Sequence, residues 1–170
     1  MLELIPCDNK ILSEVMPDFD FDNPIIDPYK LEEDLVIKMA EKNGIGLAAP
    51  QVGIEARVFA IVTRNLEGVT TPFAVFNPEI IAISEEEESG EEGCLSFSGL
   101  FFHVKRPKEI IAEFFDRDKN KLIITLTGID ARCFQHELDH LNGVCFTSKV
   151  SKFKLDRAIA KQRKNNGRTK

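Results

Sequence analysis

The sequence predicts a single domain of the mixed class, in which several strands accompany a few helices. Three segments have the residue spacing of amphipathic helices, and six short runs are rich in β-branched and aromatic residues. The chain has 170 residues, of which 43% are hydrophobic, enough for one compact core. We therefore expect one domain over residues 1–150, followed by a basic C-terminal helix and a frayed tail over residues 151–170.

The first helix is expected over residues 27–42. Asp27 can accept hydrogen bonds from the first free N–H groups, and Pro28 suits the first turn. Apolar residues recur every four positions, at Leu31, Leu35 and Met39. Asn43-Gly44 should end the helix. The segment before it contains three prolines and is expected to be an extended arm that wraps around the domain.

Six strands are expected after this helix, at residues 57–63, 73–76, 80–83, 100–104, 110–115 and 122–126. Asp116 to Asn120 is a plausible hairpin turn between the last two, because Asp and Asn side chains hydrogen-bond to their own backbone. Residues 85–92 carry six carboxylates in eight positions. Such a charge run is usually a solvated loop.

A second helix is expected to open at Thr127, whose hydroxyl can cap it, and to stop at Asn142-Gly143. One side of this helix would carry four residues, namely Ile129, Cys133, His136 and His140. A third amphipathic segment, over residues 151–164, would bury three residues, namely Phe153, Leu155 and Ile159.

The second helix contains the pattern His136-Glu137-x-x-His140. Residues four apart lie on one face of a helix, so both imidazoles can reach one metal ion. Glu137 could then reach a water bound to that ion. The pattern is short and can occur by chance, and the two histidines could instead be ordinary core or surface residues.

A catalytic metal needs a third protein ligand and an open position. No His or Glu follows His140, which leaves Asp156 or Cys145 downstream. Upstream, Cys94 lies beside Gly93, where the backbone can approach closely, and is the better candidate. A lone cysteine is more often a small buried apolar residue, so the residue pattern alone leaves this ligand open.

The net charge of −6 argues against a general nucleic-acid binder, and no specific DNA contact is expected. We expect no membrane association, because no apolar run is long enough to span a bilayer and no signal segment is recognisable. The four cysteines are interpreted as free thiols or ligands in a reducing compartment. We expect a cytoplasmic protein, or one in the host cytoplasm if its source is viral.

Three blocks occur in an order that resembles the peptide deformylases. They are Gly44-Ile-Gly-Leu-Ala-Ala-Pro-Gln51, Glu92-Gly-Cys-Leu-Ser96 and Gln135-His-Glu-Leu-Asp-His-Leu-Asn-Gly143. The resemblance spans roughly residues 2–150, so residues 1–150 are expected to be a deformylase-like catalytic domain.

The resemblance implies an α+β fold, in which antiparallel or mixed strands wrap around a central metal-binding helix. It implies that Cys94, His136 and His140 hold one divalent metal. Fe(II) is expected in the cell, with Ni, Co or Zn possible in the isolated protein. The implied reaction removes the N-formyl group from N-formylmethionyl peptides and releases formate, with Glu137 moving the protons.

Further roles follow from the same resemblance. The Gln51 side-chain amide and the Leu95 backbone N–H are expected to stabilise the oxyanion. Residues expected to bind the substrate are Ile45, Gly46, Gly93, Cys133 and Arg132. Relatives commonly carry apolar residues at the positions of Gly90 and Arg132, so the pocket here should be wider or more polar at its rim. Glu92 is expected to pair with Arg106 behind the pocket, and His103 is expected to be structural.

The implied partners are nascent formylated peptides. From Lys149 onward there are nine Lys or Arg residues and one acid, which would suit ribosomal RNA, so the C-terminus is a candidate ribosome contact. The alternatives are a helical metallopeptidase that cuts internal peptide bonds and a non-enzymatic binding domain. The missing downstream ligand disfavours the first, and the second gives Gln51 and Glu137 no role.

Overall fold

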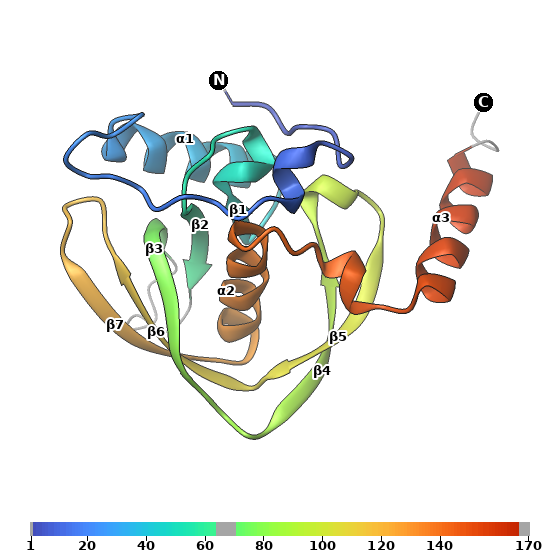
Figure 1. The fold of residues 1–170 in the computed structure, drawn as a ribbon. Coiled ribbons are helices and arrows are strands. Elements are labelled where there is room, and N and C mark those ends of the chain that lie inside the picture. The colour runs from blue at the N-terminus through green and yellow to red at the C-terminus, as the bar shows by residue number, and fades with distance from the viewer. Residues whose placement is uncertain (1, 64–70, 167–170) are drawn as a thin grey trace.

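The computed structural model describes residues 2–63 and 71–166 and has the predicted α+β fold. Two antiparallel sheets enclose a central helix (Figure 1). The strands are β1 (Gly46–Ala48), β2 (Val58–Thr63), β3 (Thr71–Ile83), β4 (Glu87–Gly93), β5 (Phe101–Pro107), β6 (Glu109–Phe115) and β7 (Lys121–Thr127). The α-helices are α1 (Pro28–Glu41), α2 (Gly128–Leu141) and α3 (Lys152–Asn166).

The larger sheet has the order β1-β2-β3-β6-β7, and the smaller sheet pairs β4 with β5. Two runs that were predicted as separate strands form the single strand β3. Asn77 has a φ of 49° and the register shifts between Phe76 and Glu79, so the strand bends there without ending. The turn at residues 116–120 is confirmed, because the Asp116 side chain accepts hydrogen bonds from the backbone of Asp118 and Asn120.

The acidic run was wrongly predicted as a solvated loop, because most of it forms β4. In the backbone register, Glu88 lies opposite Arg106 and Glu91 lies opposite His103. Two ion pairs join the sides of the hairpin, Glu92 with Arg106 and Glu86 with Lys108. Opposite charges on paired strands are favourable. Glu92 is buried, whereas the other carboxylates of this strand are exposed. Charge pairing across the hairpin therefore allows a strand of low intrinsic β-propensity.

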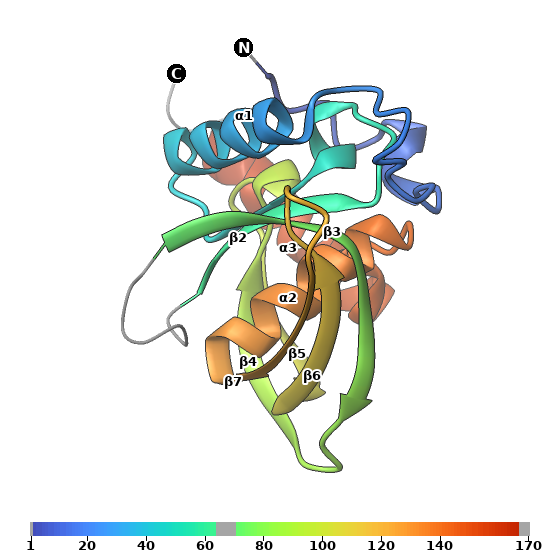
Figure 2. The ribbon, with the colours of Figure 1, turned by 90° about the vertical axis from the view of Figure 1, so that its left-hand side faces the viewer.

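Helix α2 lies between the two sheets and is buried on most of its surface (Figures 1 and 2). Thr127 is the N-cap residue, as predicted, but the prediction that its hydroxyl caps the helix was wrong, because its side chain makes no capping hydrogen bond. The C-terminal stop is confirmed, with Asn142 at the cap and Gly143 at a φ of 69°. A Cβ atom at Gly143 would lie 2.7 Å from the Ser13 backbone, so glycine is needed here.

The predicted boundaries of helix α1 are confirmed, and the Asp27 side chain accepts a hydrogen bond from the Lys30 N–H. It packs its buried face against the larger sheet (Figure 2). The N-terminal segment is largely extended apart from a short 3-10 turn at Lys10–Ser13. It crosses the domain and buries four apolar side chains, namely Ile11, Leu12, Met16 and Phe19.

Helix α3 packs Leu155 and Ile159 against a small apolar cluster around Phe146, as predicted. The prediction for Phe153 was wrong, because this side chain is 75% exposed. The end of the predicted frayed tail, residues 167–170, lies outside the described residues. Within the described part of the chain, the helices lack the length and apolar character that crossing a membrane requires.

Candidate active site

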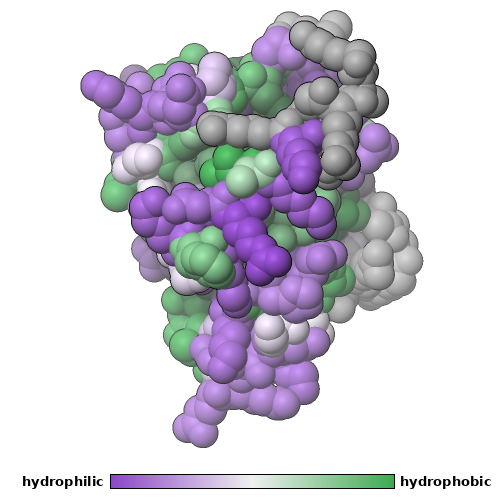
Figure 3. Space-filling view, turned by 90° about the vertical axis from the view of Figure 1, so that its right-hand side faces the viewer, coloured by the Kyte–Doolittle hydropathy of each residue, from purple (hydrophilic) through white to green (hydrophobic). Residues whose placement is uncertain are grey.

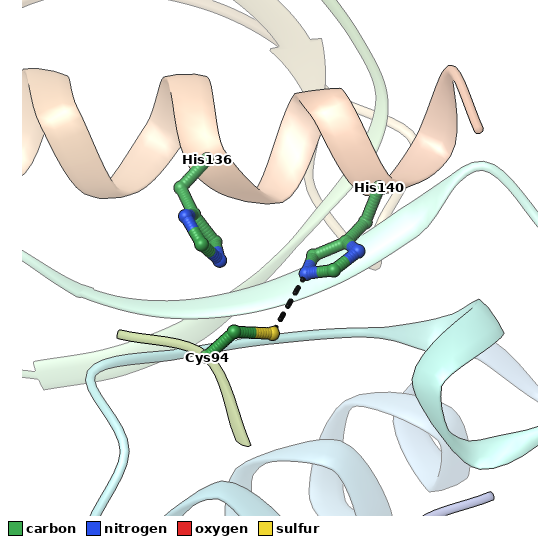
Figure 4. A group of neighbouring side chains, drawn as sticks. All are labelled: Cys94, His136 and His140. Carbon is green, nitrogen blue, oxygen red and sulfur yellow. Dashed lines mark hydrogen bonds between the residues drawn. The ribbon is translucent and has the colours of Figure 1, made fainter. Parts of the chain in front are cut away.

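Cys94, His136 and His140 converge on one point (Figure 4). Their potential ligand atoms all lie within 4.8 Å of one another, and Cys94 Sγ is 3.2 Å from His140 Nε2. The two histidines project from the same face of α2, as their spacing predicts. Cys94 comes from the segment that follows β4. The three residues that the sequence singled out as ligands are thus brought together.

Glu92 fixes one of these histidines from behind. Its Oε2 atom lies 3.0 Å from His136 Nδ1, which leaves Nε2 of that ring free to face the cluster. Arg106 donates hydrogen bonds to both oxygens of the same carboxylate, from Nε to Oε1 at 2.6 Å and from Nη2 to Oε2 at 2.8 Å. The predicted Glu92–Arg106 pair is therefore confirmed. Carboxylates that hold a ligating histidine in this way orient it toward a metal.

Arg106 reaches a second carboxylate, that of Asp139, at 2.8 Å. Burial would raise the pKa of Glu92, but the hydrogen bonds from Arg106 and His136 lower it to about 2. Glu92 is therefore ionised under ordinary conditions. The sequence predicted the Arg106 contact but not the contact with His136.

The charge balance of the site favours a cation. Burial alone would lower the pKa of His136, but hydrogen bonds with Cys94 and Glu92 raise it to about 10. Burial and the charges of His136 and Arg106 lower the pKa of His140 to about 3, so this ring is neutral and offers a lone pair. The Cys94 sulfur, the neutral His140 ring and the buried Glu92 carboxylate thus surround a position that stabilises positive charge. That charge can be a proton or a metal ion.

Glu137 lies in the wall of the same cleft and is buried. Burial raises the pKa of its carboxyl group to about 7. Its Oε2 atom has no hydrogen-bond partner among the residues that the structure describes. A buried acceptor without a protein partner usually faces a water or a ligand.

Gln51 is held in one orientation at the cluster. Its Oε1 atom accepts a hydrogen bond of 2.8 Å from the Ala48 N–H. Its Nε2 atom is 3.3 Å from Cys94 Sγ and 3.1 Å from Ser96 Oγ. Because the oxygen is occupied, the amide presents its N–H groups to the cluster. The contact with Ser96 had no signal in the sequence beyond its place in a matched block.

A cleft of about 590 Å³ opens beside the cluster. Its lining includes the predicted site residues Ile45, Gly46, Gln51, Gly93, Cys94, Leu95, Arg132, Cys133, His136 and Glu137. His103 is exposed on β5, outside the cluster. Phe101 lies at the rim, whereas Phe102 is buried against Phe146. Gly90 and Arg132 are in contact, which the sequence did not indicate.

Comparisons with known proteins agree with this geometry. Residues 1–156 match the family model described as polypeptide deformylase. A peptide deformylase from Prochlorococcus marinus (strain NATL1A) is 46% identical over 123 residues, which cover 72% of this chain and 60% of that relative. The chain thus spans less than two thirds of this curated relative.

Two solved structures are similar over more of their length. That of peptide deformylase from Ehrlichia chaffeensis in complex with actinonin has a TM-score of 0.85 and 38% identity, and the match covers 97% of each chain. The Met-Ala-Ser-bound structure of class I type b peptide deformylase from Acinetobacter baumannii has a TM-score of 0.80 and 29% identity. That match covers 88% of this chain and 98% of the other.

Proposed function

Because the chain belongs to the polypeptide deformylase family, we propose that it removes the N-formyl group from N-formylmethionyl peptides and releases formate during the maturation of nascent proteins. The observation that carries this proposal is the meeting of three metal-ligating side chains, a buried carboxylate and an oriented amide in one cleft. We further propose residues 1–150 as the catalytic domain and residues 151–170 as an appended basic helix and tail.

Cys94, His136 and His140 would hold one divalent metal. Their mutual proximity, the position of the His136 Nε2 atom toward the cluster and the neutral ring of His140 support this assignment. When bound there, the metal would supply Lewis-acid polarisation and an acidified water. A thiolate with two imidazoles suits several divalent ions. We propose Fe(II) in the cell, by the family resemblance, with Ni, Co or Zn possible in the isolated protein.

Glu137 would move the protons. Its unpartnered buried oxygen would accept a proton from the attacking water and then deliver it to the leaving amine. A carboxyl group whose pKa is near 7 can perform both steps near neutral pH. Its burial in the cleft wall also keeps bulk water from competing for that proton.

Gln51 and Leu95 would stabilise the negative charge that develops on the formyl oxygen. The Gln51 amide is already oriented by Ala48, so little reorganisation would be needed during the reaction. Leu95 is the first residue of a short 3-10 turn that follows Cys94, and the first N–H groups of such a turn have no acceptor within it.

The substrate backbone would lie along Ile45, Gly46 and Gly93, and its first side chain would enter the cleft beside Cys133 and Arg132. Ile45 is half exposed, and Gly46 belongs to β1, which forms one edge of the larger sheet. An extended peptide can hydrogen-bond to such an edge as an added strand. This arrangement would present the formyl group to the metal ligands.

A ribosome contact through α3 is a further part of the proposal. This helix stands at one side of the domain (Figure 1), and hydrophilic side chains predominate on the face it occupies (Figure 3). Cosedimentation with ribosomes at low salt should fall when residues 151–170 are deleted. Unchanged cosedimentation would remove this contact from the proposal. We place the reaction in the cytoplasm, or in the host cytoplasm for a viral protein.

The decisive test is formate release from formyl-Met-Ala-Ser by iron- or nickel-loaded protein under anaerobic conditions. The Glu137→Gln variant should retain metal and lose activity by about 10²-fold to 10⁴-fold. If neither the parent nor the variant releases formate although metal is shown to be bound, the assigned reaction is refuted. Cleavage of unformylated peptides at internal bonds would favour the metallopeptidase alternative, and a silent Glu137→Gln variant would favour the binding domain.

A further inference from the structure

Arg132 fills a space that Gly90 leaves open. A Cβ atom at position 90 would lie 2.7 Å from both Cζ and Nε of Arg132, which is closer than real Cβ contacts. The two residues lie 42 positions apart in the sequence, one on β4 and the other on α2. A side chain at position 90 would therefore displace the Arg132 guanidinium from its present position, so the two positions act as a matched pair.

The guanidinium is fixed by hydrogen bonds on one side. Nη1 lies 2.8 Å from both Glu92 Oε1 and the Val104 carbonyl, and Nη2 lies 2.7 Å from the Glu88 carbonyl. A weaker contact of 3.5 Å joins Nη1 to the Gly90 carbonyl. Nε has no hydrogen-bond partner within the described part of the chain. An arginine has five N–H donors, so donor capacity remains for a ligand.

Arg132 is one of the residues that line the cleft. Arg132 precedes His136 by four residues on α2, so the two lie on the same helix face, about 6 Å apart along the axis. A peptide whose formyl carbon lies at the metal ligands has its first Cα only two bonds further along. An extended side chain of methionine length would then reach Arg132.

The charges around Arg132 limit what it can attract. Glu91 and Glu92 also line the cleft, and Glu92 already pairs with Arg132. A carboxylate on the ligand would meet these acidic groups, whereas a neutral acceptor would use the remaining N–H donors without added repulsion. This part of the cleft is therefore suited to a substrate side chain that ends in a neutral polar group.

From this geometry we propose that Arg132, seated against Gly90, is a specificity-determining residue that lets the cleft bind a first side chain ending in a neutral hydrogen-bond acceptor. The inference rests on the proposed deformylase function. Methionine sulfoxide has this chemistry, since it keeps the length of methionine and adds one strong acceptor oxygen. The cleft would thus process formyl peptides whose first residue is oxidised, which an apolar wall would reject.

The test compares kcat/KM for formyl-Met-Ala-Ser and for the same peptide with methionine sulfoxide. The ratio of the two values is independent of the fraction of protein that holds metal. In Arg132→Leu the sulfoxide-to-methionine ratio should fall by about threefold to tenfold, as expected for one lost hydrogen bond. Lys105→Leu is the matched control, because Lys105 is an exposed cation on β5, and its ratio should equal that of the parent.

Gly90→Ala provides a second variant in case Arg132→Leu does not fold. Its methyl group should displace the guanidinium and lower the same ratio, and combining it with Arg132→Leu should cause no further fall. An unchanged ratio in whichever of these variants folds would overturn the inference.

A direct binding measurement separates this inference from the proposed reaction. Calorimetry with Met-Ala-Ser and its sulfoxide form requires no turnover. A sulfoxide preference that is lost in Arg132→Leu would support the inference even if formate release failed. Equal relative binding in the parent and the variant would refute it even if formate release succeeded.

Discussion

Gly46 and Glu137 occupy adjoining space, because a Cβ atom at position 46 would lie 2.7 Å from the Glu137 Cδ atom. The buried carboxylate therefore packs directly on the backbone of β1. The strand that is proposed to align the substrate is the same element that limits where the proton carrier can lie.

Gly46→Ala should push the Glu137 carboxylate out of position. We expect kcat to fall by about tenfold or more while metal content stays unchanged, since a displacement of 1 Å can have a larger cost. Gly44→Ala is the matched control, because its Cβ atom would meet the end of the flexible Leu95 side chain at 2.9 Å. Equal kcat values for the two variants would contradict the close-packing argument.

Gln51→Leu should remove a donor to the developing oxyanion without changing the size of the side chain greatly. The expected cost is about 3 kcal/mol of transition-state stabilisation, seen in kcat more than in KM. Steady-state kinetics with formyl-Met-Ala-Ser would measure it. A change in KM alone would mean that Gln51 contributes to ground-state binding instead.

Glu92→Gln should destabilise the fold strongly. Glu92 is the shared partner of Arg106, Arg132 and His136, and removing one charge from such a buried group typically costs about 3–5 kcal/mol. Urea denaturation would measure the loss. Glu87→Gln, on an exposed position of the same strand, should be nearly neutral. A loss below 1 kcal/mol for Glu92→Gln would mean that the network is not cooperative.

Metal removal should change the reactivity of Cys94 toward an alkylating reagent. In metal-loaded protein the thiolate would be occupied, and a chelator should expose it to the cleft. Cys133 should resist alkylation in both states, because burial raises the pKa of its thiol. Cys145, whose pKa burial raises to about 11, should also react slowly at pH 8. Mass spectrometry of alkylated peptides would show whether chelation selects Cys94.

Local sequence patterns predicted most of the elements, and they predicted the histidine ligands well. Helix α1 and the hairpin at Asp116 depend on contacts within a few residues, so their local signals were sufficient. The ligand pair His136 and His140 is likewise set by helical spacing. Cys94 needed the family resemblance, because its position depends on how β4 packs beside α2.

The errors came from interactions between distant residues. Strand β4 was missed because its pairing with β5, which includes the ion pair between Glu92 and Arg106, is not revealed by any local pattern. The contact between Gly90 and Arg132 also joins distant segments, so the sequence indicated a polar rim but not a fixed guanidinium. Phe153 was wrongly assigned to the core, since helical periodicity identifies an apolar face but not whether a partner covers each position.

The origin of the three candidate ligands has a consequence for folding. Cys94 lies in the connection between β4 and β5, whereas His136 and His140 belong to the helix that lies against the larger sheet. An ion held by all three would cross-link the hairpin to the rest of the domain, as a disulfide cross-links distant segments. Backbone amides of β4 and β5 should then exchange with deuterium more slowly after metal binding, while those of β2 and β3 change little.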